Sequence, residues 1–185
     1  SPAVFAASQS WVAEPADAQW VNGANWSGGA APGGINMTGN TVNNDTATFS
    51  NAIPGSLIGS ATIPILVDDA TTDGNRSRQL GSILFTGNAG AYVFSSASPT
   101  VVPSTGILYL SHNGSITMTA EVTNSQRFEV PIYTRLPSST AGIYSFINNA
   151  TDPNATLYIA SAINDSANAR GTDFQLNGSN TGANT

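Results

Sequence analysis

The chain has 185 residues and 40% of them are hydrophobic, which is enough for one domain with a sizeable core. Only 9% of the residues are charged, five arginines stand against eleven carboxylates, and lysine does not occur. The net charge of −6 disfavours nucleic acid and anionic membrane surfaces as partners, because both require clustered cations. The sequence has no cysteine, which excludes disulfides and thiolate chemistry, and the strongest apolar stretch, Ile63 to Val67, is too short for membrane insertion.

Residues 1–50 are expected to form a leader, a cap and a glycine-rich loop. Ser1 to Ala7 is apolar and ends in small residues, which resembles the region around a secretory cleavage site. This pattern predicts an exported protein that is extracellular or at the cell surface. Trp11, Trp20 and Trp26 provide aromatic area for a cap, and a turn-rich stretch extends from Gly23 to Gly34.

Residues 51–185 are expected to form one continuous β-rich domain, whose first strand lies just before it. The predicted strands are short, rich in Val, Ile, Thr, Tyr and Phe, and bounded by turn residues. They are Thr46–Phe49, Ala61–Val67, Gly81–Phe85, Tyr92–Ser95, Gly106–Leu110, Ser115–Met118, Arg127–Tyr133, Gly142–Phe146, Thr156–Ile159 and Asp173–Leu176. Ser161 to Arg170 is the best helix candidate, but it is short and contains Asn and Asp.

Two all-β architectures suit these strands: a right-handed parallel β-helix (β-solenoid) with a Trp-rich N-terminal cap, and an antiparallel β-sandwich. Apolar segments recur at intervals of roughly 25 residues or fewer, close to the lower end of the range for stacked repeats. Their centres are Leu84, Leu108, Ile132, Leu157 and Phe174. Asn-Gly and Asn-Asn pairs between the segments suit the sharp corners of a β-helix. The β-helix is therefore the preferred prediction.

Several motifs resemble a known family. Trp20-Val21-Asn22-Gly23, Asn25-Trp26-Ser27, Asp45-Thr46-Ala47-Thr48-Phe49 and Leu80-Gly81-Ser82-Ile83-Leu84-Phe85 are similar to segments of bacterial proteins with autotransporter-associated β-strand repeats. The resemblance implies an exported parallel β-helix at the cell surface, without catalytic residues. It does not extend to the secretion route, because no membrane barrel or sorting signal accompanies these motifs.

The expected function is therefore a non-catalytic structural or adhesive surface protein. An open end of a β-helix must be capped or paired, so we expect self-association into a filament or continuation into further repeats of a longer chain. Two alternatives stay open at this point. The first is a carbohydrate-binding β-sandwich module, and the second is a pilin-like subunit that donates Ser1 to Val12 to a neighbour.

Three kinds of binding or modification site are candidates. Trp20 and Trp26 could form a platform for glycans, although a core role is the simpler interpretation. Asp68, Asp69 and Asp73 form an acidic loop that could bind calcium, but they lack the regular spacing of known calcium loops. Asn-X-Ser/Thr signals for glycosylation occur at Asn25, Asn36, Asn44, Asn75, Asn113, Asn149, Asn154, Asn164 and Asn177.

The sequence offers little for catalysis. His112 is the single histidine, and it precedes an Asn-Gly turn with no nucleophile motif around it. A polysaccharide lyase would combine acidic metal ligands with a basic residue, and no arginine of this chain has an evident acidic cluster at one-coil spacing. No catalytic residue and no cofactor other than calcium is predicted.

Overall fold

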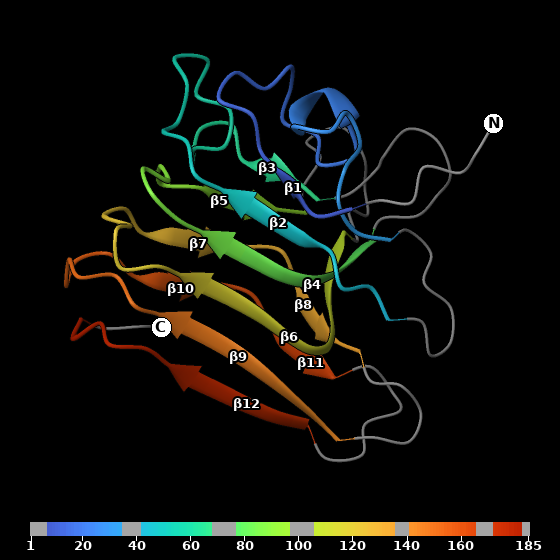
Figure 1. Cartoon of the computed structure of the whole chain (residues 1–185), viewed down its shortest axis with the longest axis vertical. Helices are drawn as coiled ribbons and strands as arrows, with labels where there is room; N and C mark the ends of the chain where they lie inside the picture. The colour runs from blue at the N-terminus through green and yellow to red at the C-terminus, as the bar shows by residue number, and fades with distance from the viewer. Residues whose placement is uncertain are drawn as a thin grey trace.

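A computed structural model describes residues 7–34, 42–67, 77–96, 106–135, 141–165 and 172–182 (Figure 1). Within these ranges the regular structure is a single 3-10 turn, η1 (Gly23–Asn25), and twelve β-strands. The strands are β1 (Gln9–Ser10), β2 (Thr46–Phe49), β3 (Ile65–Leu66), β4 (Ser77–Phe85), β5 (Val93–Ser95), β6 (Ile107–Met118), β7 (Gln126–Phe128), β8 (Ile132–Thr134), β9 (Gly142–Asn148), β10 (Leu157–Ile159), β11 (Ile163–Asp165) and β12 (Thr172–Asn177). The protein is therefore all-β with almost no helix.

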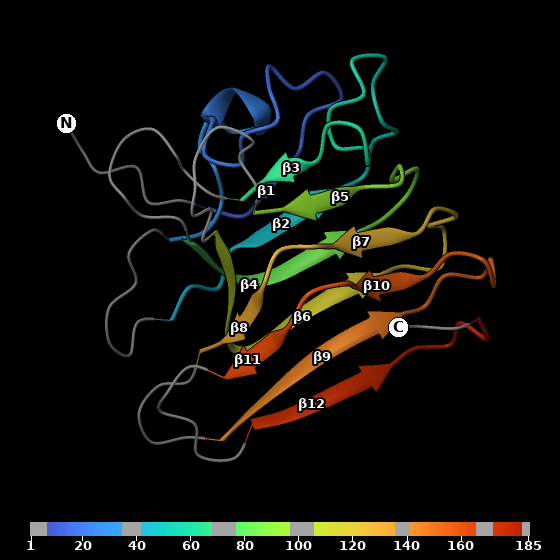
Figure 2. The same cartoon turned by 180° about the vertical axis from the view of Figure 1, so that it is seen from behind.

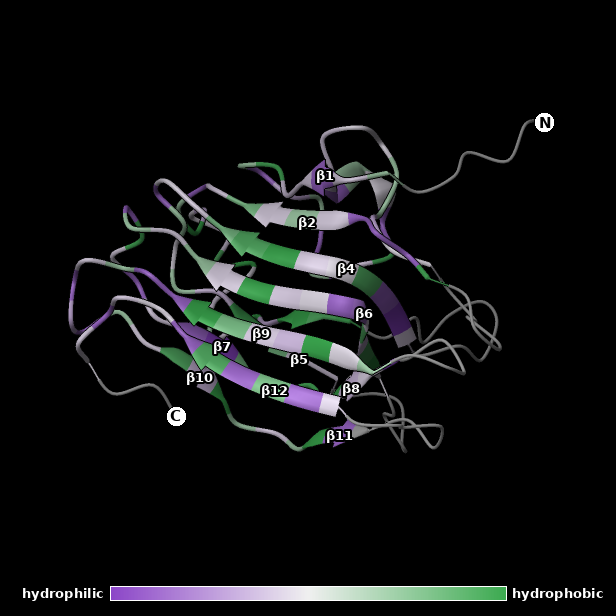
Figure 3. Ribbon diagram, turned by 60° about the horizontal axis from the view of Figure 1, so that its bottom comes forward, coloured by the Kyte–Doolittle hydropathy of each residue, from purple (hydrophilic) through white to green (hydrophobic). Residues whose placement is uncertain are grey.

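The strands pair in parallel and form three ladders. In the first ladder β1, β2, the second half of β4, the second half of β6, β9 and β12 follow one another, as Figure 3 shows for the strands from β2 to β12. The second ladder is β3, β5, β7 and β10, seen from behind in Figure 2. The third consists of the first halves of β4 and β6, then β8 and β11.

For most strand pairs the separation between partners is longer than the interval predicted from the sequence. In the first ladder Thr46 pairs with Ser82, and Ser115 pairs with Ser145. Successive strands of the first ladder are therefore separated by roughly 30 residues or slightly more. The shorter predicted interval is correct between Leu108 and Ile132, which pair in the third ladder, but it is wrong as a general repeat. Leu84 and Leu108, the first two predicted repeat centres, belong to different ladders, so their separation measures a step between ladders.

The parallel pairing overturns the antiparallel β-sandwich alternative. Every pair of named strands is parallel, and antiparallel contacts in the described residues are the isolated bridges Trp11–Trp26 and Gly34–Gln79. Adjacent strands of a sandwich are joined by hairpins and run antiparallel. Here the chain always leaves a ladder before it returns to it.

Two predicted strand boundaries are also wrong. Gly106–Leu110 and Ser115–Met118 belong to one strand, β6, because Asn113 takes a positive φ of 60° and turns the strand without ending it. Arg127–Tyr133 is two strands, β7 and β8, which lie in different ladders on either side of a corner at Pro131. The expected absence of a helix near Ser161 holds for residues 163–165, which form β11.

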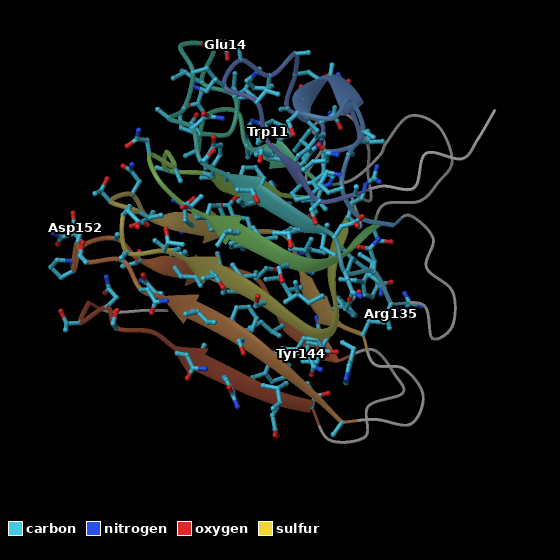
Figure 4. All side chains as sticks on the ribbon, viewed as in Figure 1. Trp11, Glu14, Arg135, Tyr144 and Asp152 are labelled. Atoms are coloured by element: carbon cyan, nitrogen blue, oxygen red, sulfur yellow. The ribbon has the colours of Figure 1, made fainter. Side chains whose placement is uncertain are left out.

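The core is continuous along the ladders, and its first part is aromatic. Alternate residues of the first ladder point inward, so Phe49, Phe85 and Met118 stack in register and are fully buried. Figure 4 shows Trp11 beside the first strands and Tyr144 on β9. Both side chains are 0–1% exposed, so the core reaches from the N-terminal segment as far as β9.

Raising the pH from about 10 toward 12 is expected to destabilise the protein through Tyr92. The ring is 1% exposed, its hydroxyl donates to the carbonyl oxygen of Asn51 at 2.9 Å, and burial raises the pKa of Tyr92 to about 12. The unfolded chain loses this proton near pH 10, while the folded chain keeps it. The free energy of unfolding should fall by roughly 2–3 kcal/mol across this window.

Urea unfolding at pH 8 and at pH 11 measures roughly half of this loss, because pH 11 lies midway between the two pKa values. The matched variant Tyr92→Phe keeps the ring and removes the titrating hydroxyl, so its stability should fall less over the same interval. A fall of equal size in Tyr92→Phe would assign the alkaline destabilisation to other groups.

Candidate functional site

The N-terminal ends of all three ladders are covered by backbone. On the first ladder Val12 N donates to Asn25 O and Ser27 N donates to Ser10 O, both at 2.9 Å, so residues 25–27 run along β1. On the second, Trp20 N donates to Leu66 O at 2.9 Å. On the third, the amide of Gly34 donates to Gln79 O at 2.9 Å. We call residues 11–34, which follow β1, the cap.

The cap is fixed internally by one buried asparagine. Asn25 is 0% exposed, and its Oδ1 accepts from the backbone of Ala16 at 2.8 Å and of Asp17 at 3.3 Å. Its Nδ2 donates to Asp17 Oδ1 at 2.9 Å and to the carbonyl of Gln19 at 2.8 Å. Burial opposes ionisation of Asp17, but hydrogen bonds from Asn25, Asn22 and the Gln19 amide outweigh it and hold the pKa of Asp17 below its usual range.

Trp20 and Trp26 are core residues of the cap, in agreement with the simpler interpretation of the sequence. They are 0% and 2% exposed, and their ring centroids are 4.8 Å apart. Their indole Nε1 atoms donate to the carbonyl oxygens of Pro32 (3.1 Å) and Trp20 (2.8 Å). A glycan platform needs an exposed ring face. The carbohydrate site predicted at these two residues is therefore wrong for the folded chain.

Tryptophan fluorescence is expected to report three buried indoles, because Trp11, Trp20 and Trp26 are the only tryptophans and are at most 2% exposed. Iodide should quench the native emission weakly, and added oligosaccharides should not change it. Unfolding in urea should shift the emission to longer wavelength and raise iodide quenching several-fold. Strong quenching of the native protein would contradict the burial of the cap.

The C-terminal ends of the ladders differ from the N-terminal ends. β12, β10 and β11 are each the last strand of a ladder, and in the described part of the chain no further strand lies beyond them. Tyr144 and Phe146 of β9 are 0% and 2% exposed. Their register partners on β12, Phe174 and Leu176, point to the same inner side but are 45% and 76% exposed. In the part of the chain that the structure describes, the apolar interior is therefore open at this end.

A cavity of about 480 Å³ lies at the open end. It is bounded by residues from the last strand of each ladder and by the β9 residues beneath them: Phe146, Asn148, Leu157, Ile159, Ser161, Ile163, Leu176, Asn177 and Gly178. Beside it, Asn148 Nδ2 donates to the carbonyl of Ala155 at 2.8 Å. The cavity can accept apolar side chains, while β12 offers backbone groups for pairing.

The sequence pattern singles out no residue at the C-terminal end of the ladders. The alternation of Phe174 and Leu176 could have drawn attention to this end, because these residues are the register partners of the inward-pointing Tyr144 and Phe146 of β9. Periodicity identifies a buried face but not what covers it, so it marks these residues only as parts of a strand. They form the candidate functional site, which we call the open edge: β12 together with the cavity behind it.

The remaining predicted sites are dispersed. The calcium candidates Asp68, Asp69 and Asp73 lie outside the described residues, as do Asn36 and Asn75. Asn25 is wrong as a glycosylation site of the folded chain, because it is buried and both hydrogens of its amide nitrogen have acceptors. The other Asn-X-Ser/Thr positions that lie within or beside described strands and turns are Asn44, Asn113, Asn149, Asn154, Asn164 and Asn177.

Neither a catalytic histidine site nor a metal centre emerges from the described residues. His112 is half-buried on β6. Across the described ranges no group of three or more His, Asp or Glu side chains is placed to hold a metal ion, and no helix is long and apolar enough to cross a membrane. No protein-family model, curated protein or solved structure matches the chain significantly.

Proposed function

We propose that the chain is a right-handed parallel β-helix with a Trp-rich N-terminal cap, and that it serves as a non-catalytic structural or adhesive protein outside the cell. The supporting geometry is the repeated return of the chain to the same ladder, always in parallel. Parallel crossover connections are right-handed in nearly all proteins, which supports the handedness.

The observation that carries a structural function is the open edge. The described strands form an apolar interior that is covered at one end and exposed at the other. An exposed parallel edge with inward-facing Phe174 and Leu176 is a template for further β-structure. We therefore propose that the protein works by joining other β-structure at this edge, either further repeats of a longer chain or another molecule.

Three features of the chain agree with a structural function and with export. The described lining of the cavity consists of apolar, serine, glycine and amide residues, which suit packing against further β-structure. Neutral polar residues provide the solubility of a chain with 9% charge. The resemblance to autotransporter-associated repeats, and of Ser1–Ala7 to a cleavage region, supports a location at the cell surface or in the medium.

Calcium binding and glycosylation are the two site predictions that this proposal retains. The acidic loop at Asp68, Asp69 and Asp73 is the calcium candidate, and the accessible Asn-X-Ser/Thr positions are the candidates for attached sugars. Neither is required for the first ladder, whose strands from β2 to β9 pair through their own backbones.

Immunogold electron microscopy of intact producing cells tests the location. Antibodies against the purified chain should label the outside of unpermeabilised cells, or the protein should be recovered from the medium. Labelling that appears only after permeabilisation would overturn the proposal. An antibody against a cytoplasmic protein of the same cells is the control for their integrity.

A further inference from the structure

The two ends of the fold cannot pair with each other. At the N-terminal end the cap occupies the edges of β1, β3 and the first half of β4 with hydrogen bonds of 2.8 to 3.0 Å. At the other end β12 keeps one side without a strand in the described part of the chain. Two copies that meet head to tail would therefore leave β12 facing the closed cap. An edge-to-edge contact between two copies therefore has to use the C-terminal end of each copy, where β12 is the longest of the three edge strands.

A contact of β12 with β12 is self-complementary in sequence. A two-fold axis along the normal of the first ladder places two β12 strands antiparallel and keeps the inner face of one continuous with the inner face of the other. Inward residues then face inward residues only in registers where the paired residue numbers have an even sum. Phe174 and Leu176 are the inward residues, and Asp173, Gln175 and Asn177 point outward.

One such register satisfies both the apolar and the charged side chains. With Gln175 on the two-fold axis, Phe174 of each copy faces Leu176 of the other, and Asp173 faces Asn177. Both large apolar side chains gain an apolar partner. The single carboxylate of the strand meets an amide instead of the other carboxylate, which would be repulsive. An axis placed on Asp173 would bring the two Asp173 side chains opposite each other.

We propose that the chain forms a closed two-fold dimer through its open edge, with β12 paired antiparallel to β12 of a second copy and the two cavities joined. This inference rests on the proposed function and makes it specific: the partner is a second copy, and assembly stops at two. A filament requires a second open edge, and the cap removes it.

The mass of the purified 185-residue chain in solution tests the proposal. Sedimentation velocity over a range of protein concentrations should show an equilibrium between a species of 18.9 kDa and one of twice that mass. The larger species should not grow further at high concentration. Leu176→Lys places two cations in the joined cavity and should leave only monomer, while Leu57→Lys changes an exposed leucine distant in sequence from β12 and should leave the dimer intact.

Charge changes at Asn177 test the register and do not depend on a disrupted fold. Asn177→Asp puts a second carboxylate opposite Asp173, and Asn177→Lys puts a cation there. The dimer dissociation constant should rise in the first variant and fall in the second, each by roughly 2- to 30-fold, because two such pairs form per dimer. Circular dichroism checks that each variant keeps the fold of the parent.

Three results would overturn the proposal: monomer at all concentrations, open-ended polymers that grow with concentration, or a dimer indifferent to Leu176→Lys and to both Asn177 variants. Any of these would leave the surface location untouched, because immunogold labelling measures it separately. Labelling confined to the cytoplasm, with an intact dimer, would instead overturn the proposed function and keep this inference.

Discussion

Replacing Phe49 by alanine is expected to lower the free energy of unfolding by about 3–5 kcal/mol, the largest loss for a single core position. The ring is 0% exposed. Six aromatic ring centroids lie within 6.0 Å of its own, from Trp11, Trp20, Trp26, Phe85, Tyr92 and Phe94. Phe49 therefore packs against the cap and against the first two ladders. The cavity left by its removal would be lined by rings from several segments.

Phe174→Ala is the matched control, because it removes the same side chain from the open edge. Phe174 is 45% exposed and its ring contact is with Tyr144, at 6.3 Å between centroids. Its loss should cost about 1 kcal/mol or less. Urea unfolding of both variants in the Leu176→Lys background keeps association out of the comparison. Similar losses at the two positions would mean that the core is not centred on Phe49.

Asn25→Ala is expected to destabilise the protein by about 3–5 kcal/mol, although it removes no apolar contact area. Four hydrogen bonds end on this amide, and the backbone groups of Ala16, Asp17 and Gln19 would lose their partner inside the cap. A buried polar group without a partner costs about 1–3 kcal/mol. Thermal and urea unfolding measure the loss, and Asn154→Ala, an exposed amide whose side chain bonds to nearby Asp152, should stay within about 0.5 kcal/mol of the parent.

The variant Asn25→Asp tests the effect of a negative charge at position 25 while the side chain keeps nearly the same shape. The new carboxylate has nearly the same shape, but it faces the Asp17 carboxylate at the 2.9 Å contact that the amide now makes. This variant should be at least as unstable as Asn25→Ala at pH 7. Protonation restores one donor, so its deficit relative to the parent should shrink as the pH falls below about 5. A deficit independent of pH would argue against this arrangement of the cap.

Most strands are predictable from the sequence because they carry a local signal. β-Branched and aromatic residues with alternating burial identify β2, β6 and β9 without reference to the rest of the fold. The Asn- and Gly-rich corners and the spacing of the apolar segments predicted parallel pairing correctly, although the predicted repeat length holds only between Leu108 and Ile132. Apolar spacing mixes the first ladder with the third, because both contain short aliphatic strands.

Features that depend on distant residues escaped prediction. The Gly-rich surroundings of Trp20 and Trp26 suggest an exposed loop, but the glycines allow the backbone to fold closely around the two indoles. Gly23 shows this, because a Cβ atom there would lie 2.2 Å from the carbonyl oxygen of Gly29. Asn25 carries a glycosylation signal, whereas its burial depends on Asp17 and on backbone that is distant in sequence. The exposure of Leu176 likewise depends on whether another segment covers β12, and alternation within a strand does not encode this.

The register of the ladders has a consequence for the order in which the chain folds. Each strand from β4 onward pairs with a strand that precedes it in the chain, so it needs that earlier strand as a template. The N-terminal part of the chain leaves the ribosome first, and it already contains the cap. Folding can therefore proceed in one direction, with each strand added to a ladder that already exists. An error near Phe49 would affect every strand added later, whereas an error in β12 would affect that strand alone.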